Sequence, residues 1–314
     1  MPIVDNVSLV SPAPLTLRGR TFTAANPAVM GIVNRTPDSF YASGRFDDLG
    51  RAAAAVDQLV ADGADLIDIG GVRAGQQGDW VEAGQEVERV LPLLERVRAD
   101  HPDLLLSLDT WRAEVARACA GVGIDLVNDT WQSADPELVH VAAALGAGYV
   151  VTHTGGAAPR TDPDGVRYGP SGPDGRPRDE PDDIVADVLT VLTHGANRAR
   201  QAGIPRAAIM IDPTLDFGKT TRHSLRVLRA TAQLAGLGYP VLQALSRKDF
   251  VGETLDLPVE ERLEGTLAAT AVAGWLGTVC FRAHDVRATR RVVDMVASIR
   301  GDRPAAVNVR GVGP

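Results

Sequence analysis

Eight short apolar runs, each followed by a longer segment with the apolar spacing of a helix, constrain the fold of this chain most. The first run is VMGIV at 29–33, the last is TVCF at 278–281, and the last helical segment is predicted at 286–299. The units span about 270 residues, close to the usual size of a (β/α)8, or TIM, barrel. A doubly wound parallel sheet needs the same α/β alternation, but eight regular units without a linker favour a single barrel domain.

Two shorter segments flank the predicted barrel domain at 29–300. In the N-terminal extension at 1–28, the sequence LTLRGRTFT alternates around Arg18-Gly19-Arg20, which predicts a β-hairpin that covers one end of the core. Residues 301–314 are predicted to form a C-terminal tail.

Composition limits the kinds of partner. The chain has 314 residues and a net charge of −8, which argues against general affinity for nucleic acid or anionic membranes, because both need a positive surface. Cys119 and Cys280 lie among apolar neighbours, which indicates buried thiols rather than a disulfide or a metal site. With no signal-peptide pattern and no run of the roughly 18 apolar residues that a membrane helix needs, we expect a cytoplasmic protein.

The segment 209–219, IMIDPTLDFGK, illustrates how a unit ends. Its first three residues form an unbroken apolar run, typical of a strand covered on both faces. Asp212 follows directly, at the strand end where barrels place their chemistry. An aspartate before Pro213 is also typical of a simple turn, so the assignment depends on whether other strands end in the same way.

Residues suited to ligand binding do follow the other predicted strands. They are Asn34, Gly70 with Gly71, Asp109, Asn128, His153, Asp212, Ser246 with Lys248, and Arg282 with His284. Each alone could be a helix N-cap or a turn residue. In a barrel, however, the C-terminal ends of all strands meet at one rim, so we expect these residues to surround one site.

The first chemical group in this set is made of carboxylates, an amide and an ammonium. Asp109, Asn128, Asp212 and Lys248 together suit an edge of alternating donors and acceptors on a flat heterocycle. Lys248 could instead form a Schiff base, but the two carboxylates would favour its protonated form.

The second group suits an anion. Arg282 and His284 are one residue apart on an extended strand end and project on the same side, and with the amide of Asn34 they suit phosphate oxygens.

Eight segments at successive strand ends resemble dihydropteroate synthases of folate biosynthesis. They are GIVNRTPDSF, DLIDIGG, SLDTWRAEVARA, DLVND, IMIDPTLDFGKT, LSRKDFVGETL, RLEGTLAAT and FRAHDV. The resemblance covers nearly all of 29–299. It implies a (β/α)8 barrel that condenses 6-hydroxymethyl-7,8-dihydropterin pyrophosphate with p-aminobenzoate, with Mg²⁺ on the pyrophosphate, and a homodimer.

The resemblance also implies a role for each matching residue. Asp109, Asn128, Asp212, Phe217 and Lys248 would hold the pterin; Asn34, Arg282 and His284 would bind pyrophosphate, with Asn34 near the metal; Ser246 would lie toward the aminobenzoate; and Asn34, Lys248, Arg282 and His284 would be catalytic. Stabilisation of the departing diphosphate would then dominate catalysis, since the aryl amine is already a neutral nucleophile at pH 7.

The chain departs from the family pattern after strand two. The usual Gly-Gly-Glu-Ser-Thr-Arg-Pro-Gly is replaced by GGVRAGQQ at 70–77, so Ala74 and Gly75 stand in the threonine and arginine places. Those groups help to order the loop around pyrophosphate and to form the aminobenzoate pocket, and Arg73 would compensate in part.

Smaller departures follow strands five and seven. Thr152-His153-Thr154 replaces Met-His-Met, which would exchange apolar ring contacts for hydroxyls. Ala244 replaces a glycine, and an added methyl at a close contact commonly costs on the order of 1–3 kcal/mol.

Two functional hypotheses therefore stand side by side. The first is a working synthase with an altered loop, supported by the retained pyrophosphate residues. The second is a degenerate paralogue, resembling a second copy found in actinobacteria, that binds a pterin or related ligand with little or no synthase activity. A methyltetrahydrofolate-binding corrinoid methyltransferase domain shares the pterin end, but Asn34 and Arg282-Ala283-His284 argue against it.

Three long loops and one helix leave alternatives open. The loops at 34–48 and 154–182 are unusually long for βα connections, and the second is either a disordered insertion, the favoured alternative, or an ordered lid. The loop at 72–84 has a glycine near each end and could move over a site. The helix LEGTLAATAVAGW at 263–275 is apolar almost all round, which fits either a dimer interface or plain core packing.

Overall fold

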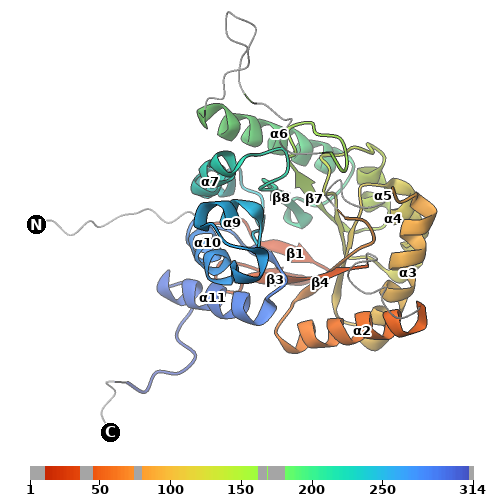
Figure 1. Cartoon of the computed structure of the whole chain (residues 1–314), viewed down its shortest axis with the longest axis horizontal. Coiled ribbons are helices and arrows are strands. Elements are labelled where there is room, and N and C mark those ends of the chain that lie inside the picture. The colour runs from red at the N-terminus through yellow and green to blue at the C-terminus, as the bar shows by residue number, and fades with distance from the viewer. Residues whose placement is uncertain (1–10, 36–44, 74–79, 162–167, 169–180, 311–314) are drawn as a thin grey trace, which may run out of the picture.

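The computed structural model describes residues 11–35, 45–73, 80–161, 168 and 181–310. At its centre is an eight-stranded parallel sheet in the order β8-β7-β6-β5-β4-β3-β10-β9, and a bridge between Ile211 and Val241 joins its two outer strands. Helices surround the strands (Figure 1). The predicted (β/α)8 barrel is confirmed.

The barrel strands lie close to the predicted apolar runs. They are β3 (Ala28–Asn34), β4 (Leu66–Gly70), β5 (Leu105–Asp109), β6 (Leu126–Asn128), β7 (Gly148–Thr152), β8 (Ile209–Asp212), β9 (Leu242–Ala244) and β10 (Cys280–Ala283).

The helices also follow the predicted segments, with two differences. They are α2 (Arg45–Ala61), α3 (Ala83–Asp100), α4 (Ala113–Ala118), α5 (Leu138–Ala144), α6 (Pro181–Gln201), α7 (Thr221–Arg229), α8 (Thr231–Ala235), α9 (Asp249–Leu255), α10 (Leu263–Trp275) and α11 (Val286–Ile299). The apolar spacing at 224–235 predicts a single helix, but the structure divides this segment into α7 and α8. Helix α9 was missed, because seven residues are too few to establish a helical period.

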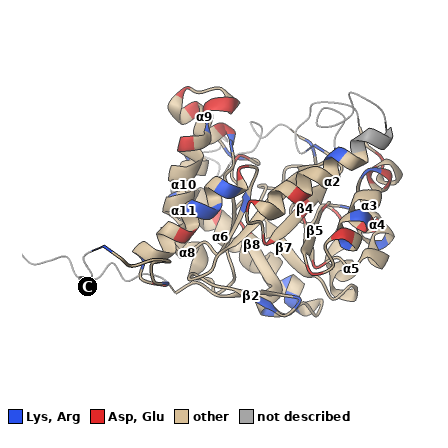
Figure 2. Cartoon of the chain, turned by 90° about the horizontal axis from the view of Figure 1, so that it is seen from below, with Lys and Arg blue, Asp and Glu red and all other residues tan. Residues whose placement is uncertain are grey.

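The N-terminal hairpin closes the floor of the barrel. Strands β1 (Leu15–Leu17) and β2 (Arg20–Phe22) pair antiparallel around a tight turn in which Arg18 and Gly19 have φ of 45° and 75°. Leu17 and Phe22 pack with the lowest inward side chains, such as Met30 and Leu66. The hairpin lies at the opposite end of the molecule from α9 (Figure 2), so it leaves uncovered the C-terminal ends of the strands, where barrels of this kind place their ligand sites.

Other sequence expectations can be compared with the described residues. Cys119 and Cys280 are buried free thiols, as predicted. In the described part of the chain, no helix combines the length and apolar character needed to cross a membrane. The central parts of the three long loops, at 36–44, 74–79, 162–167 and 169–180, lie outside the described residues.

Candidate ligand site in the barrel

The alternation of side chains along the strands places a polar layer above the apolar floor. Leu66 and Leu105 belong to the floor, so Asp68 and Ser107, two residues further on, face the same interior. The same step leads from Leu126 to Asn128, from Met210 to Asp212 and from Cys280 to Arg282. Five strands therefore contribute polar side chains to one enclosed space.

Asp68 lies at the centre of this layer. It is fully buried, and its carboxylate accepts hydrogen bonds from Ser107 Oγ at 2.5 Å, Asn128 Nδ2 at 3.0 Å and Arg282 Nε at 2.6 Å. The donors come from β5, β6 and β10. We did not single out Asp68 from the sequence, although a carboxylate within a buried strand always needs such partners.

Asp109 shares Arg282 with Asp68. Its carboxylate accepts hydrogen bonds from Arg282 Nη2 at 2.8 Å and Thr130 Oγ1 at 3.0 Å. Gly70 leaves room for it, because a Cβ there would come within 3.2 Å of the Asp109 Cβ. Burial and the charge of Asp68 raise the pKa of Asp109 to about 7, although Arg282 opposes that shift.

Asp212 faces the interior from β8, as predicted. One carboxylate oxygen accepts a hydrogen bond from the backbone N–H of Thr214 at 2.7 Å. Burial raises the pKa of Asp212, and the positive charge of Lys248 acts against that shift more than any other group. The Asp212 carboxylate and the Lys248 ammonium therefore interact electrostatically.

Lys248 and two aromatic rings form one wall. The ammonium lies 5.0 Å from the centroid of the Phe217 ring and donates a hydrogen bond to the carbonyl of Leu215. Trp131 contacts Phe217 edge to face, with ring centroids 5.3 Å apart. Burial lowers the pKa of Lys248, although Asp216 and Asp212 favour its charged form. Trp131 was another residue missed from the sequence.

Lys219 stabilises the backbone of the loop that carries Phe217. This buried ammonium donates hydrogen bonds to the carbonyls of His153, Thr214 and Phe217 at 2.7, 3.2 and 3.0 Å. Asp216 ties the same loop to α9, because its carboxylate accepts from the backbone N–H of Phe250 at 3.2 Å. The wall therefore has a fixed backbone.

Ser246 and His284 lie together at the rim. Ser246 Oγ is 3.2 Å from His284 Nδ1 and accepts a hydrogen bond from the His284 backbone N–H, also at 3.2 Å. Although the residue as a whole is exposed, desolvation by neighbouring groups and the charge of Arg282 lower the pKa of His284 to about 4, so the imidazole is neutral at pH 7. Asn34, half-buried, ends β3 and is level with Gly70.

The structure corrects one member of the predicted rim. His153 follows the inward Thr152 and turns outward, where its Nε2 pairs with Asp187 of α6 at 2.7 Å. The hydroxyl of Thr152 donates to the Asp129 carbonyl at 2.6 Å, and the backbone N–H of Thr154 donates to the Gln132 side chain. These groups join neighbouring loops instead of offering hydroxyls to a ligand.

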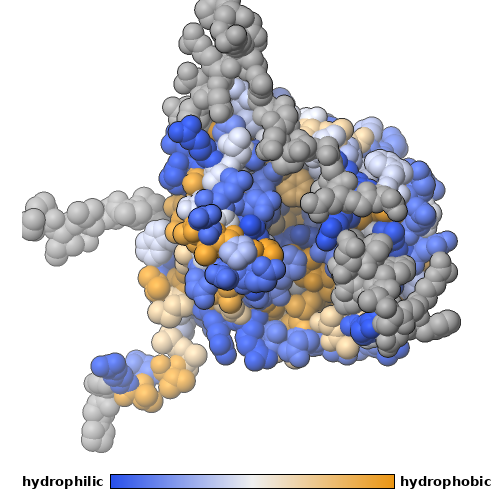
Figure 3. Space-filling model, viewed as in Figure 1, coloured by the Kyte–Doolittle hydropathy of each residue, from blue (hydrophilic) through white to orange (hydrophobic). Residues whose placement is uncertain are grey.

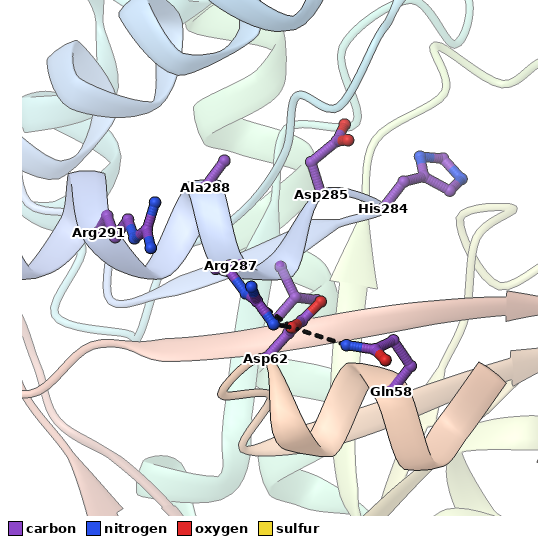
Figure 4. Close-up of a pocket in the computed structure, with 8 residues that line it drawn as sticks. Gln58, Asp62, His284, Asp285, Arg287, Ala288 and Arg291 are labelled. Carbon is purple, nitrogen blue, oxygen red and sulfur yellow. Dashed lines mark hydrogen bonds and ion pairs between the residues drawn. The ribbon is translucent and has the colours of Figure 1, made fainter. Parts of the chain in front are cut away.

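A groove of about 450 Å³ lies beside the rim and is lined by residues of α2 and α11 and by those that precede α11. Helices α2 and α11 form its sides, and Arg287 reaches across it to Asp62 (Figure 4). His284 stands at its edge.

Comparison with known proteins identifies the relationship. The model of the family described as "Pterin binding enzyme" matches residues 30–284. A Mycobacterium leprae protein named "Inactive dihydropteroate synthase 2" is 51% identical over 94% of this chain and 98% of its own length. The dihydropteroate synthase of Bacillus subtilis is 33% identical over 93% of this chain and 94% of that protein. The chain belongs to the dihydropteroate synthase family.

The family's solved structures agree with this fold. A dihydropteroate synthase from Xanthomonas albilineans in complex with 7,8-dihydropteroate superposes with a TM-score of 0.75 and 33% identity, covering 94% of this chain and 100% of that chain. Within this dihydropteroate synthase fold, the residues predicted from the sequence fall into two sets. Asp109, Asn128, Asp212, Lys248 and Arg282 gather in the interior, with Phe217 beside Lys248, whereas Asn34, Ser246 and His284 lie at the rim.

Proposed function

We propose that this protein binds a pterin-class heterocycle inside the barrel and does not condense it efficiently with p-aminobenzoate. The main support is the arrangement of acceptors and donors around one interior. The Oδ1 atom of Asn128 and the second carboxylate oxygen of Asp212 accept no hydrogen bond from the described residues. Neither is among the solvent-inaccessible atoms that lack a partner, so both are accessible to a ligand. Lys248 supplies donors beside Asp212, with which its ammonium interacts electrostatically.

The shape of such a ligand follows from these groups. Acceptor atoms on β6 and β8 suit an amino group beside a ring N–H, and the ammonium of Lys248 suits a ring carbonyl or ring nitrogen. Phe217 and Trp131 offer apolar ring surface. A pterin presents all of these features on one flat molecule.

Loss of the condensation step is inferred from the rim. The strand-two loop lacks the Ser-Thr-Arg-Pro sequence that would order itself around diphosphate and aminobenzoate. The relative that is 51% identical is named as inactive. A working synthase remains the second candidate, favoured by the retention of Asn34, Arg282 and His284.

We propose that Asn34, Arg282 and His284 would contact the diphosphate of a phosphorylated pterin. Arg282 uses Nε and one N–H of Nη2 for Asp68 and Asp109, and within the described part of the chain its other three N–H groups are left for another anion. His284 would add one neutral hydrogen bond. Ser246, its partner, would lie toward the amine substrate.

Mg²⁺ would bind at this rim only together with the diphosphate. Among the described residues, no group of three His, Cys, Asp or Glu side chains could hold a metal ion by itself. Mg²⁺ commonly takes most of its ligands from substrate phosphates and water, and the amide oxygen of Asn34 would supply one ligand from the protein. When bound, the ion would neutralise charge on the leaving diphosphate.

Two assays on the same protein test this proposal. Calorimetry with 6-hydroxymethylpterin should detect binding. In the second assay, this protein is mixed with 6-hydroxymethyl-7,8-dihydropterin pyrophosphate, p-aminobenzoate and Mg²⁺. It should release pyrophosphate at least about 100-fold more slowly than a synthase such as that of Bacillus subtilis. Comparable rates for the two proteins would favour the working synthase. Absence of pterin binding would reject both candidates.

A homodimer in the cytoplasm is proposed as the working form. Apolar side chains gather over α10 and α11 (Figure 3), and Val272, Met295 and Ile299 are 48%, 60% and 59% exposed. A second copy of the chain would cover them. Sedimentation velocity of the wild type and of Met295→Glu should give a dimer and a monomer, and two equal masses would argue against this surface.

A further inference from the structure

We propose that Asp68 is a positioning residue of the ligand site: it turns the amide oxygen of Asn128 toward the bound heterocycle and holds Arg282 against Asp109. This inference rests on the proposed binding of a pterin-class ligand. Asp68 itself is fully buried beneath its three partners, so it acts through them and not by touching the ligand.

The orientation of Asn128 follows from the chemistry of its partner. A carboxylate only accepts hydrogen bonds, so the group of Asn128 that faces Asp68 at 3.0 Å must be its NH₂. The oxygen on the other side of the amide then points away from Asp68. Because Asn128 is 2% exposed and well enclosed by β5 and β7, a flip would bring two acceptor oxygens together in a dry interior.

This orientation decides what Asn128 can recognise. With the NH₂ committed to Asp68, the side chain presents an acceptor to the ligand, as Asp212 does from β8. The two together select a heterocycle edge that carries N–H donors. Without Asp68, the amide could present either group and would lose that selectivity.

Asp68 also controls the charge of the neighbouring pair. One guanidinium, that of Arg282, serves two carboxylates, with Asp68 at 2.6 Å and Asp109 at 2.8 Å. The other groups that act on Asp109 are Glu86 of α3, which raises its pKa, and the Thr130 hydroxyl, which lowers it. Removal of the Asp68 charge would leave Arg282 to Asp109 and make its carboxylate form at lower pH.

Two substitutions separate geometry from charge. In Asp68→Asn, the new carbonyl can face Asn128 and Arg282 while the new NH₂ donates to Ser107, so the network keeps its shape and loses one charge. In Asp68→Leu, both acceptors are lost. Asp125→Asn is the matched control, since Asp125 pairs with Arg98 at 2.8 Å at the far end of the barrel with similar burial.

The measurements are the titration of the Asp109 carboxyl carbon by ¹³C NMR without ligand, assigned with Asp109→Asn, and the affinity for 6-hydroxymethylpterin between pH 5 and 9. For Asp68→Asn we expect the midpoint of the Asp109 titration to fall by about one pH unit or more. At the pH where each protein binds 6-hydroxymethylpterin most tightly, the affinity of this variant should be within about threefold of that of the wild type. For Asp68→Leu we expect affinity to fall by at least about thirtyfold. Asp125→Asn should change neither quantity.

The outcomes distinguish this inference from the proposed function. If the wild type binds the pterin but Asp68→Leu binds it equally well, or Asp68→Asn leaves the Asp109 titration unchanged, then Asp68 has no positioning role and the proposed function stands. If the wild type does not bind the pterin, the proposed function is wrong. The ligand-free titration then still decides whether Asp68 controls the charge of Asp109.

Discussion

The interior of the barrel and its rim differ in how their polar side chains are held. In the interior, Asn128 and Arg282 both donate hydrogen bonds to Asp68, so that three strands are joined away from solvent. At the rim, Ser246 and His284 have each other as partners, and His284 is exposed. Buried polar groups need their partners, whereas solvated ones tolerate change. Divergence concentrated at the rim would therefore alter turnover more than recognition of the heterocycle.

Asp212→Ala should have the largest effect, because it removes an interior acceptor. The donor edge of the ligand and the Lys248 ammonium would both lose a carboxylate in an enclosed site. We expect affinity for 6-hydroxymethylpterin to fall at least about 100-fold, about 3 kcal/mol, by calorimetry. The exposed Asp100→Ala, which breaks only the surface pair with Arg96, should bind normally. Unchanged affinity of Asp212→Ala would mean that the interior is not the ligand site.

The pH dependence of stability should reveal the interior without any ligand. The pKa of Asp109 is raised to about 7 in the folded protein, so the folded state holds a proton that the unfolded state releases, and stability falls as pH rises toward 7. His153, whose buried ring has its pKa lowered to about 4, has the opposite effect between pH 4 and 6.5.

Asp109→Asn isolates the carboxyl contribution from that of His153. The unfolding free energy of the wild type relative to this variant should fall by about 2 kcal/mol between pH 5 and 7, measured by urea denaturation at each pH. A constant difference between the two proteins would show that Asp109 titrates in its ordinary range.

The sequence predicted the interior better than the details of the rim, for a physical reason. A strand alternates its side chains, so Asp109, Asn128 and Asp212 at three strand ends necessarily share one space. The same rule should have excluded His153, which follows an inward Thr152. Asp68 lies within the run LIDIG, and a single charged residue in an otherwise apolar strand does not by itself indicate a binding site.

Other features depend on contacts that no local pattern contains. Arg282 was correctly placed beside His284 in the sequence, but its long side chain reaches across β3 to Asp68 on β4. Trp131 becomes part of the wall only because the β6–α5 and β8–α7 loops meet, where its ring contacts Phe217. Such contacts follow from the closed barrel and could not be derived from either loop alone.

Restoring the family sequence to the strand-two loop would test the rim directly. The replacements are Arg73→Ser, Ala74→Thr, Gly75→Arg and Gln76→Pro. If the interior is intact and the loop is the defect, pyrophosphate release should rise about tenfold, or about 1.4 kcal/mol in the barrier. The same replacements combined with Asp212→Ala should give no gain. No increase in the otherwise wild-type protein would indicate a different substrate.

His284→Ala should have the smallest effect, because the contact it removes is exposed and uncharged. The pKa of about 4 leaves the imidazole neutral from about pH 5 upward, so it would give the diphosphate one hydrogen bond and no net charge. We expect affinity for the pterin pyrophosphate to fall about threefold to fivefold, with affinity for 6-hydroxymethylpterin unchanged, and we expect the ratio to stay constant between pH 6 and 8. Ser246→Ala, which removes the partner of the ring, should reproduce part of the loss. A loss confined to pH below 7 would instead mean that His284 binds the diphosphate as a cation. An equal loss of affinity for both ligands would mean that His284 contacts the heterocycle, and the interior and the rim would then form one binding site.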